Sequence, residues 1–184
     1  MADSSFDAAR AVRFDLPSGS VRAAGDARVA LVPVEALAAV GKSGAADEVA
    51  GIVGSAIGKR VSARLGNAAS GSATIEAFAT ALGGELAVAG YGSLSMERWG
   101  RALVLVVEHT ALPDAMLGKV LAVAIAATSM RGEIVCEALG RDGETARFLV
   151  AAKASAARVR GWIDSGVKWG EALARLHSKS GGDA

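Results

Sequence analysis

Residues that bind metals or form disulfides are scarce in this 184-residue sequence, which contains one cysteine, Cys136, and two histidines, His109 and His177. One cysteine cannot form an internal disulfide, and a structural zinc site needs four ligands dominated by sulfur or imidazole. We therefore predict no metal and no cofactor. Because the start also lacks an apolar run after a basic flank, we expect a cytoplasmic protein.

An excess of charge of one sign is also missing, because the sequence has 20 Lys and Arg and 19 Asp and Glu, which gives a net charge of +1. Nucleic-acid binding usually requires a clear basic excess, so we predict no nucleic-acid partner. The most apolar stretch, LAVAIAATSM at 121–130, is too short to cross a bilayer, so we predict no membrane span. The 52% of hydrophobic residues is ample for a core.

Residue periodicity predicts a succession of strand pairs and helices. The first half should hold a strand in 12–19, an apolar strand and short helix in 26–42, and an amphipathic helix in 43–66 that ends at Gly66 and Asn67. A further helix should run from Ser72 or Thr74, either of which can cap it, to Leu82 or beyond. The second half should hold strands at 93–99 and 101–109 joined at Gly100, a central helix at 114–130, a hairpin over 133–152 and a helical tail to His177.

This order predicts an α+β fold, with a mainly antiparallel sheet covered on one side by helices. The strand at 101–109 is apolar on both faces up to Glu108, as in the middle of a covered sheet. We expect a disordered lead at 1–11, a domain at 12–152, a helical extension at 153–177 and a disordered tail at 178–184.

The stretches FDLPSGSVRAAGDARVALVPVEAL, AVAGYGSL and VLAVAIAATSMRGEIVCEALGRDGETARFLV, in this order and spacing, resemble the 4-vinyl reductase domain. That family is related to the small core subunits of the TRAPP vesicle-tethering complex. The resemblance covers about residues 14–150. It implies an α+β domain that often dimerises through its helices and holds a hydrophobic ligand pocket. Members act as sensors of small aromatic or hydrocarbon molecules, in tetrapyrrole biosynthesis, or as structural assembly subunits.

Some sensor members of that family bind zinc through a glutamate and cysteines in the final hairpin. Glu133 and Cys136 match the first part of this motif, whereas Ala146, or Glu144 if residues are counted without a gap, stands in place of the next cysteine. Cys136 could thus be a zinc ligand, a nucleophile or a small buried residue. Its apolar strand, IVCEAL, favours the buried residue.

His109 closes its strand next to Glu108, and adjacent strand residues point to opposite faces, so the pair does not form a ready dyad. We expect His109 to be a surface turn residue rather than a pocket histidine.

Tyr91 lies between Gly90 and Gly92, where the resemblance implies an aromatic residue that faces the ligand. A tyrosine offers an apolar ring and one hydroxyl, which suits a largely apolar ligand. The alternative is a core aromatic that anchors the corner between helix and strand. The residues that we predict as its companions, in a pocket or in the core, are Phe78, Trp99, Met116 and Phe148.

Ala50, Gly54 and Gly58 fall four residues apart, so they share one face of the long helix. Each glycine costs about 0.8–1 kcal/mol of helix stability relative to alanine, and close packing on a second helix can offset that cost. The second helix belongs either to the same chain or to a dimer partner, and the sequence leaves both open.

Two functions remain. In the first, the chain is a non-enzymatic assembly module that binds protein partners, is expected to form a homodimer, and has or lacks a small hydrophobic ligand pocket. In the second, it is a sensor domain that binds an aromatic or hydrocarbon ligand and signals to a partner. We predict no catalytic residues, because no acid–base pair emerges from the pattern.

Overall fold

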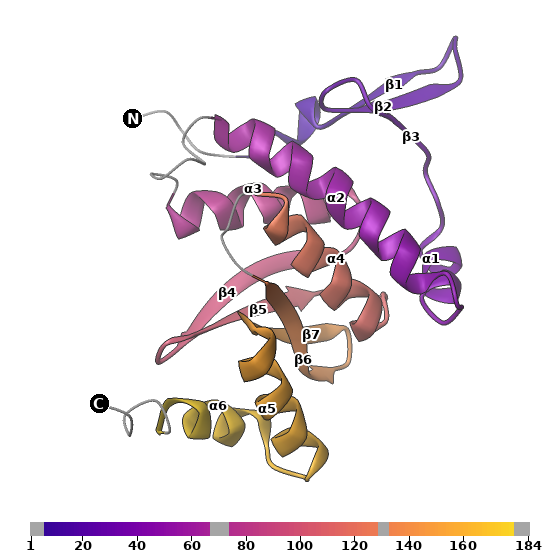
Figure 1. Ribbon diagram of the computed structural model, residues 1–184. Helices are drawn as coiled ribbons and strands as arrows, with labels where there is room; N and C mark the ends of the chain where they lie inside the picture. The colour runs from indigo at the N-terminus through magenta and orange to yellow at the C-terminus, as the bar shows by residue number, and fades with distance from the viewer. Residues whose placement is uncertain (1–5, 67–73, 129–132, 179–184) are drawn as a thin grey trace.

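A computed structural model describes residues 6–66, 74–128 and 133–178. It confirms the α+β class: antiparallel sheets are combined with helices in the predicted order (Figure 1). Two predicted positions, the cap at Ser72 and the stop at Asn67, lie outside the described residues. No helix in the described ranges is both long and apolar enough to cross a membrane.

The main sheet contains β4 (Ser93–Trp99), β5 (Ala102–Glu108), β6 (Ile134–Asp142) and β7 (Thr145–Ala152) in the spatial order β4–β5–β7–β6. Each neighbouring pair is antiparallel. β5 lies between β4 and β7, which confirms the prediction of a central strand. The turn from β4 to β5 begins at Gly100, whose φ of 62° is a left-handed conformation that glycine adopts readily.

One face of the sheet is covered by α3 (Ile75–Val88) and α4 (Asp114–Ala126), and α2 (Ala46–Leu65) packs on these two helices from outside. This side contains the larger core cluster, in which Leu105 of β5 and Phe148 of β7 are paired across the strands. Leu117 and Leu121 of α4 are fully buried against it. α2 is therefore a third layer, separated from the sheet by α3 and α4.

The opposite face is covered by α5 (Lys153–Asp164) and α6 (Trp169–Ser178), so the prediction of a sheet covered on one side is wrong. Val104 and Val106 of β5 point to this side, where Val159 and Leu173 of the two helices are buried with them. Alternate residues of a strand face opposite sides, and both sets are apolar here, so both need a cover.

The N-terminal arm, residues 12–33, forms a second small sheet of order β1–β2–β3, from β1 (Val12–Asp15), β2 (Ser20–Ala23) and β3 (Arg28–Val29). Its β1–β2 hairpin projects from the body, and α1 (Val34–Val40) connects the arm to α2 (Figure 1). The prediction of an apolar strand early in 26–42 is corrected: β3 is only two residues long. Residues 20–23, for which no strand was predicted, form β2 and pair with β1.

Residues 6–11 are not the disordered lead that the sequence predicted. They carry a 3₁₀ turn, η1 (Ala8–Arg10), and Ala11 is buried. The ring of Phe6 lies over Gly84 of α3, where a β-carbon would clash with the ring. A bare glycine in α3 thus provides the space that holds this segment, a long-range contact that local composition does not reveal.

Helix ends follow the predicted caps. The Thr74 hydroxyl accepts a hydrogen bond from the Ala77 amide at 3.2 Å and begins α3, while α2 ends at Gly66, whose φ is 57°. α3 continues through Gly83 and Gly84 to Val88, because the surrounding packing outweighs the helix cost of two glycines.

Candidate functional site

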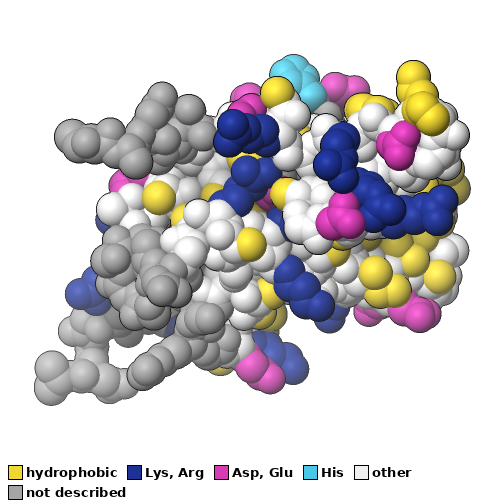
Figure 2. Space-filling model, turned by 90° about the horizontal axis from the view of Figure 1, so that it is seen from above, with side chains coloured by type: hydrophobic (Ala, Val, Ile, Leu, Met, Phe, Trp, Pro, Cys, Tyr) yellow, Lys and Arg dark blue, Asp and Glu magenta, His cyan; other side chains and the backbone are white. Residues whose placement is uncertain are grey.

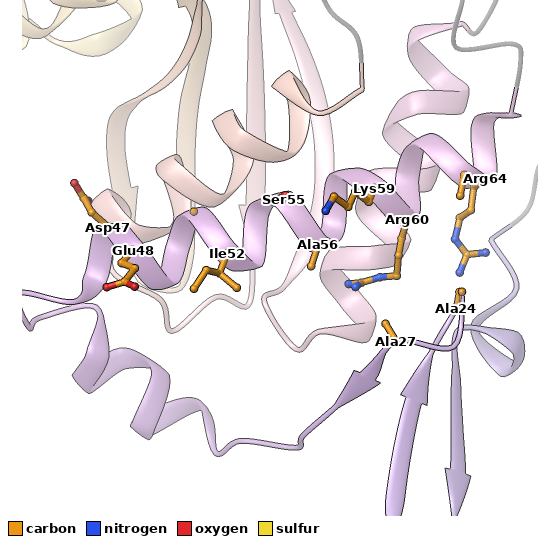
Figure 3. Close-up of a pocket in the computed structure, with 13 residues that line it drawn as sticks. Ala24, Ala27, Asp47, Glu48, Ile52, Ser55, Ala56, Lys59, Arg60 and Arg64 are labelled. Carbon is orange, nitrogen blue, oxygen red and sulfur yellow. The ribbon is translucent and has the colours of Figure 1, made fainter.

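A wide groove separates the outer face of α2 from the N-terminal arm, with a volume of about 1060 Å³ (Figure 3). We call it the α2 groove. Glu48 and Ile52 point from the helix into this space (Figure 3). The arm contributes only small residues to the lining, Ala24, Gly25 and Ala27. The α2 lining consists of Asp47, Glu48, Gly51, Ile52, Ser55, Ala56, Lys59, Arg60, Ala63 and Arg64.

The opposite face of α2 fixes the orientation of this lining. A β-carbon on Gly54 would lie 2.7 Å from the carbonyl oxygen of Val120, and one on Gly58 would lie 2.6 Å from that of Ala124. Ala50 is fully buried on the same side. The predicted stripe of small residues therefore packs on α4 of the same chain, which leaves the other face of α2 for the groove.

Charge is distributed unevenly along the groove. Asp47 and Glu48 lie in the first turn of α2, whereas Lys59 and Arg64 lie toward its end. Each sign is favourable at its own end, because the helix macrodipole is positive at the N-terminus and negative at the C-terminus. The middle of the lining is small or apolar, and the Ile52 side chain there is 64% exposed. The groove thus has an acidic end, an apolar centre and a basic end.

Two arginines at the basic end are held by one buried carboxylate. Glu85 of α3 is 2% exposed, its Oε2 accepts from Arg60 Nε at 2.5 Å, and its Oε1 accepts from Arg64 Nε at 2.8 Å. The Arg64 guanidinium also lies 4.3 Å from the centre of the Phe6 ring, a cation–π geometry. These contacts hold both arginines, whereas Lys59 is exposed and forms no ion pair with another described residue.

Large apolar side chains are also exposed on the arm, outside the lining of the groove. They are Phe14, Leu16, Leu31 and Val32, with Leu16 at 84% and Leu31 at 74% exposed. Seen from the side of α2 and the arm, hydrophobic side chains are interspersed with lysine and arginine (Figure 2). Exposed apolar patches rimmed by polar residues often mark protein-contact surfaces.

The structure does not gather the five predicted pocket residues around one space. Tyr91, Met116 and Phe148 belong to the packed core between helices and sheet, and burial raises the pKa of the Tyr91 hydroxyl, offset in part by the charge of Arg60. Phe78 lines a separate apolar cavity. Trp99 lies on the other side of the sheet, where it makes an edge-to-face contact with Trp169 at 4.9 Å between ring centres.

The apolar cavity lined by Phe78 has a volume of about 180 Å³ and lies beneath α3. Its lining does not include Tyr91. The residues around it are Leu65, Thr74, Ile75, Phe78, Met96, Leu103, Leu105, Ile125, Thr128 and Val150. Ligand pockets for drug-sized molecules usually measure 300–1,000 Å³, so this cavity fits only a much smaller molecule, about the size of one aromatic ring.

Cys136 is buried, which confirms the interpretation of a small core residue. Burial raises the pKa of its thiol from 9.0 to about 12, so the reactive thiolate is scarce at neutral pH. The backbone at Cys136 also lies close to α4, since a β-carbon on Gly118 would meet the Cys136 carbonyl oxygen at 2.8 Å. The thiol is thus a packing group on β6.

The hairpin does not fit the zinc site that the resemblance to the 4-vinyl reductase domain implies. Cys136 is paired with Val150 across the strands, whereas Ala146 is paired with Arg141. Four residues of strand separate Val150 from Ala146, about 13 Å, so a cysteine at Ala146 could not share a metal with Cys136. Among the described residues, no three His, Cys, Asp or Glu side chains come together as a metal site.

His109 is an exposed turn residue, as expected. Its φ is 57°, and its Nδ1 lies 3.9 Å from Glu144 Oε2, with both side chains largely exposed. The pair is open to solvent and belongs to no cavity described above. It lines neither the α2 groove nor the apolar cavity around Phe78.

Comparison of the chain with protein-family models, with curated proteins and with solved structures found no match. The resemblance to the 4-vinyl reductase domain therefore stays a hypothesis, and the site rests on geometry. Glu85 and its two arginines were not predicted from the sequence. A signal was present, because Arg60 and Arg64 are four apart and Glu85 is the single charge in the apolar stretch LGGELAVAG.

Proposed function

We propose that this chain is a non-enzymatic assembly module that binds protein through the α2 groove and the N-terminal arm. One observation carries the proposal: the arm, which borders the groove with Ala24, Gly25 and Ala27, exposes Phe14, Leu16, Leu31 and Val32, and the centre of the groove exposes Ile52. Apolar surface of this kind is stabilised when a partner covers it. The resemblance to structural assembly subunits implies the same class of activity, and the single cysteine favours the cytoplasm as its place.

The partner can be a second copy of the chain, as the expected homodimer requires, or a different protein. Photo-crosslinking separates these cases. Ile52 is replaced by p-benzoylphenylalanine in the cells that naturally make the protein, and the products are identified by mass spectrometry. The matched control carries the same crosslinker at Asp164, an exposed residue at the end of α5.

We expect discrete crosslinked protein from position 52 and none from position 164. Products that contain two copies indicate self-assembly, and products with another protein indicate a hetero-complex. No crosslink to protein at position 52, with the crosslinker incorporated and the chain folded, contradicts the proposed function.

The apolar cavity supports a second candidate, binding of a small hydrophobic ligand with a signal to a partner. Its volume of about 180 Å³ admits one aromatic ring, and Thr74 and Thr128 are the hydroxyl-bearing residues in its lining. Thermal-shift measurements with benzene and toluene test it. The shift should disappear in Met96→Trp, which fills the cavity, and no shift in the wild type would exclude ligand binding there.

A further inference from the structure

We propose that the basic end of the α2 groove is a binding site for a phosphate monoester that carries an apolar group. Arg60, Arg64 and Lys59 contact the phosphate, and the apolar group lies against the small residues beside them. The inference goes beyond the proposed function, because binding of a phosphate ester needs no protein partner and can be measured on the purified chain.

The two arginines are held in position without a ligand. Glu85 of α3 is 2% exposed, and its two carboxylate oxygens accept hydrogen bonds from Arg60 Nε at 2.5 Å and from Arg64 Nε at 2.8 Å. The guanidinium carbon of Arg64 also lies 4.3 Å from the centre of the Phe6 ring. Because the ordering of long side chains is one of the costs of binding, arginines that are already held reduce that cost.

Each guanidinium keeps donors for a second acceptor. A guanidinium presents several N–H groups, and in both arginines the hydrogen bond to Glu85 uses Nε alone. The Nη groups of Arg60 and Arg64 donate to no residue in the ranges that the structure describes. Both side chains line the groove and extend from α2 toward Ala24 and Ala27 of the arm (Figure 3). Their Nη groups are therefore available to an anion in the groove.

Positive charge is in excess at this end of the groove. Lys59 is exposed and forms no ion pair with another described residue, while Arg60 and Arg64 share the single charge of Glu85. The three cations thus retain an excess of two positive charges. A phosphate monoester carries about −1.5 to −2 charges at neutral pH, whereas a carboxylate carries one negative charge. Planar guanidinium groups also match the oxygen geometry of phosphate, so the phosphate ester fits this end better.

The acidic residues around the groove leave this excess in place. Asp26, in the arm, is paired with Arg13 at 3.2 Å and with Arg22 at 2.9 Å, and it is not part of the lining. The acids of the lining itself, Asp47 and Glu48, lie in the first turn of α2, about three helical turns from the basic end.

The groove has room for more than the phosphate. Its volume of about 1060 Å³ is at the upper end of the range for small-molecule pockets, about 300–1,000 Å³. Ala56 and Ala63 of α2 are exposed, and the arm lines its side with Ala24, Gly25 and Ala27. A flat apolar group can lie against these small residues, and burial of its surface stabilises the complex.

The test compares three probes on the purified full chain at low salt: phenyl phosphate, benzoate and methyl phosphate. Calorimetric titration gives the dissociation constants, and phenyl phosphate should bind at one site. Benzoate has the same ring but a single negative charge, so it should bind at least about tenfold more weakly. Methyl phosphate lacks the ring and should bind at least about threefold more weakly. Equal binding of benzoate overturns the phosphate class, and equal binding of methyl phosphate overturns the apolar contact.

Conservative variants locate the site. Arg60→Lys and Arg64→Lys keep a positive charge near Glu85 but remove the planar guanidinium, so each should weaken phenyl phosphate about tenfold. Lys59→Gln breaks no ion pair between described residues and should weaken it about threefold. Circular dichroism checks that each variant is folded, and Lys59→Gln keeps the test valid if an arginine variant does not fold. Unchanged affinity in all three variants overturns the site.

Arg22→Gln is the matched control, because Arg22 and Arg13 also share one carboxylate, Asp26, but line no part of the α2 groove. This variant should bind phenyl phosphate as the wild type does. No saturable binding by the wild type overturns the inference, and so does a loss in Arg22→Gln as large as in the groove variants. Neither result changes what crosslinking at position 52 shows, so the proposed function is tested separately.

The source of the phosphate is distinguished by one further titration, with a short phosphotyrosine peptide that contains phenyl phosphate as its side chain. Binding of this peptide that is tighter than binding of phenyl phosphate places the phosphate on a protein partner. Equal or weaker binding places it on a free small molecule.

Discussion

Gly58 of α2 lies so close to Ala124 of α4 that a β-carbon on Gly58 would stand 2.6 Å from the Ala124 carbonyl oxygen and 2.6 Å from the β-carbon of Ala127. The next glycine along the stripe, Gly54, has the same relationship to Val120. The two helices are therefore in backbone contact, which only glycine permits. This contact orients the α2 groove outward.

Gly58→Ala should destabilise the fold, although alanine is the better helix former. The helix gains about 1 kcal/mol, but a methyl group forced against the backbone of α4 costs about 1–3 kcal/mol. We expect a net loss of up to about 2 kcal/mol in the free energy of unfolding by urea. Gly51→Ala is the matched control: a β-carbon on Gly51 would have no neighbour within 4 Å among the described residues, so this variant should gain about 0.5–1 kcal/mol. Equal gains in both variants would contradict the contact. By the same reasoning Gly54→Leu should destabilise the fold, because Gly54 packs on Val120 of α4.

Glu85→Gln should destabilise the chain, because it removes the charge that both Arg60 and Arg64 contact while leaving them partly buried, at 17% and 25% exposure. Breaking a buried ion pair from one side costs several kcal/mol, and the partial exposure of the arginines reduces this to about 2 kcal/mol. Glu76→Gln, on the exposed first turn of the same helix, should change stability by about 0.5 kcal/mol or less. Denaturation curves for the two variants give the comparison, and similar losses in both would show that the buried contacts contribute little.

Cys136 should make stability fall at alkaline pH. Burial raises the pKa of its thiol from 9.0 in the unfolded chain to about 12 in the fold. The protonated thiol is thus favoured by folding; this contribution is fully present below pH 9 and is lost as the pH rises from 9 to 12. Cys136→Ala should be about 1 kcal/mol less stable at neutral pH, through lost packing. The difference in unfolding free energy between wild type and Cys136→Ala should narrow or reverse as the pH rises from 9 to 12. Parallel plots of unfolding free energy against pH would show that burial does not shift the thiol. Alkylation by iodoacetamide should be slow in the native protein and fast in urea.

Arg141→Lys should loosen the connection between β5 and α4. The guanidinium donates from Nε to Asp114 Oδ1 at 2.8 Å, from Nη1 to the Thr110 carbonyl at 2.9 Å, and from Nη2 to the Leu112 carbonyl at 2.6 Å. A lysine ammonium cannot meet all three acceptors in this planar arrangement, so we expect a loss of about 2 kcal/mol.

The control for that variant is Arg101→Lys, in the exposed turn after Gly100, which should leave stability within about 0.5 kcal/mol. Hydrogen exchange should also rise in residues 109–113 of Arg141→Lys. Unchanged exchange there would show that the three hydrogen bonds do not hold the connection.

Some features of this fold could be predicted because their causes are local. The Thr74 cap and the Gly100 turn depend on the preferences of one or two residues, and the alternation in β5 reports two apolar faces directly. The burial of Cys136 follows from the apolar strand around it. The candidate pocket around Tyr91 was less predictable, because a residue between two glycines can face either a ligand or the core. In the structure Tyr91 is part of the core, and Trp99, only eight residues later, faces the other side of the sheet.

By itself the sequence determined the order of helices and strands from α1 onward, the central strand and the inert thiol, because periodicity and turn residues act over a few neighbouring positions. Only the tertiary structure decided which faces of the helices and of the sheet pack against each other. It placed Glu85 between arginines 25 and 21 residues away, turned Ala50, Gly54 and Gly58 onto α4, and laid α5 and α6 over the second face of the sheet. The groove is the consequence, because the face of α2 that remains open is known only once its other face has been buried by long-range packing.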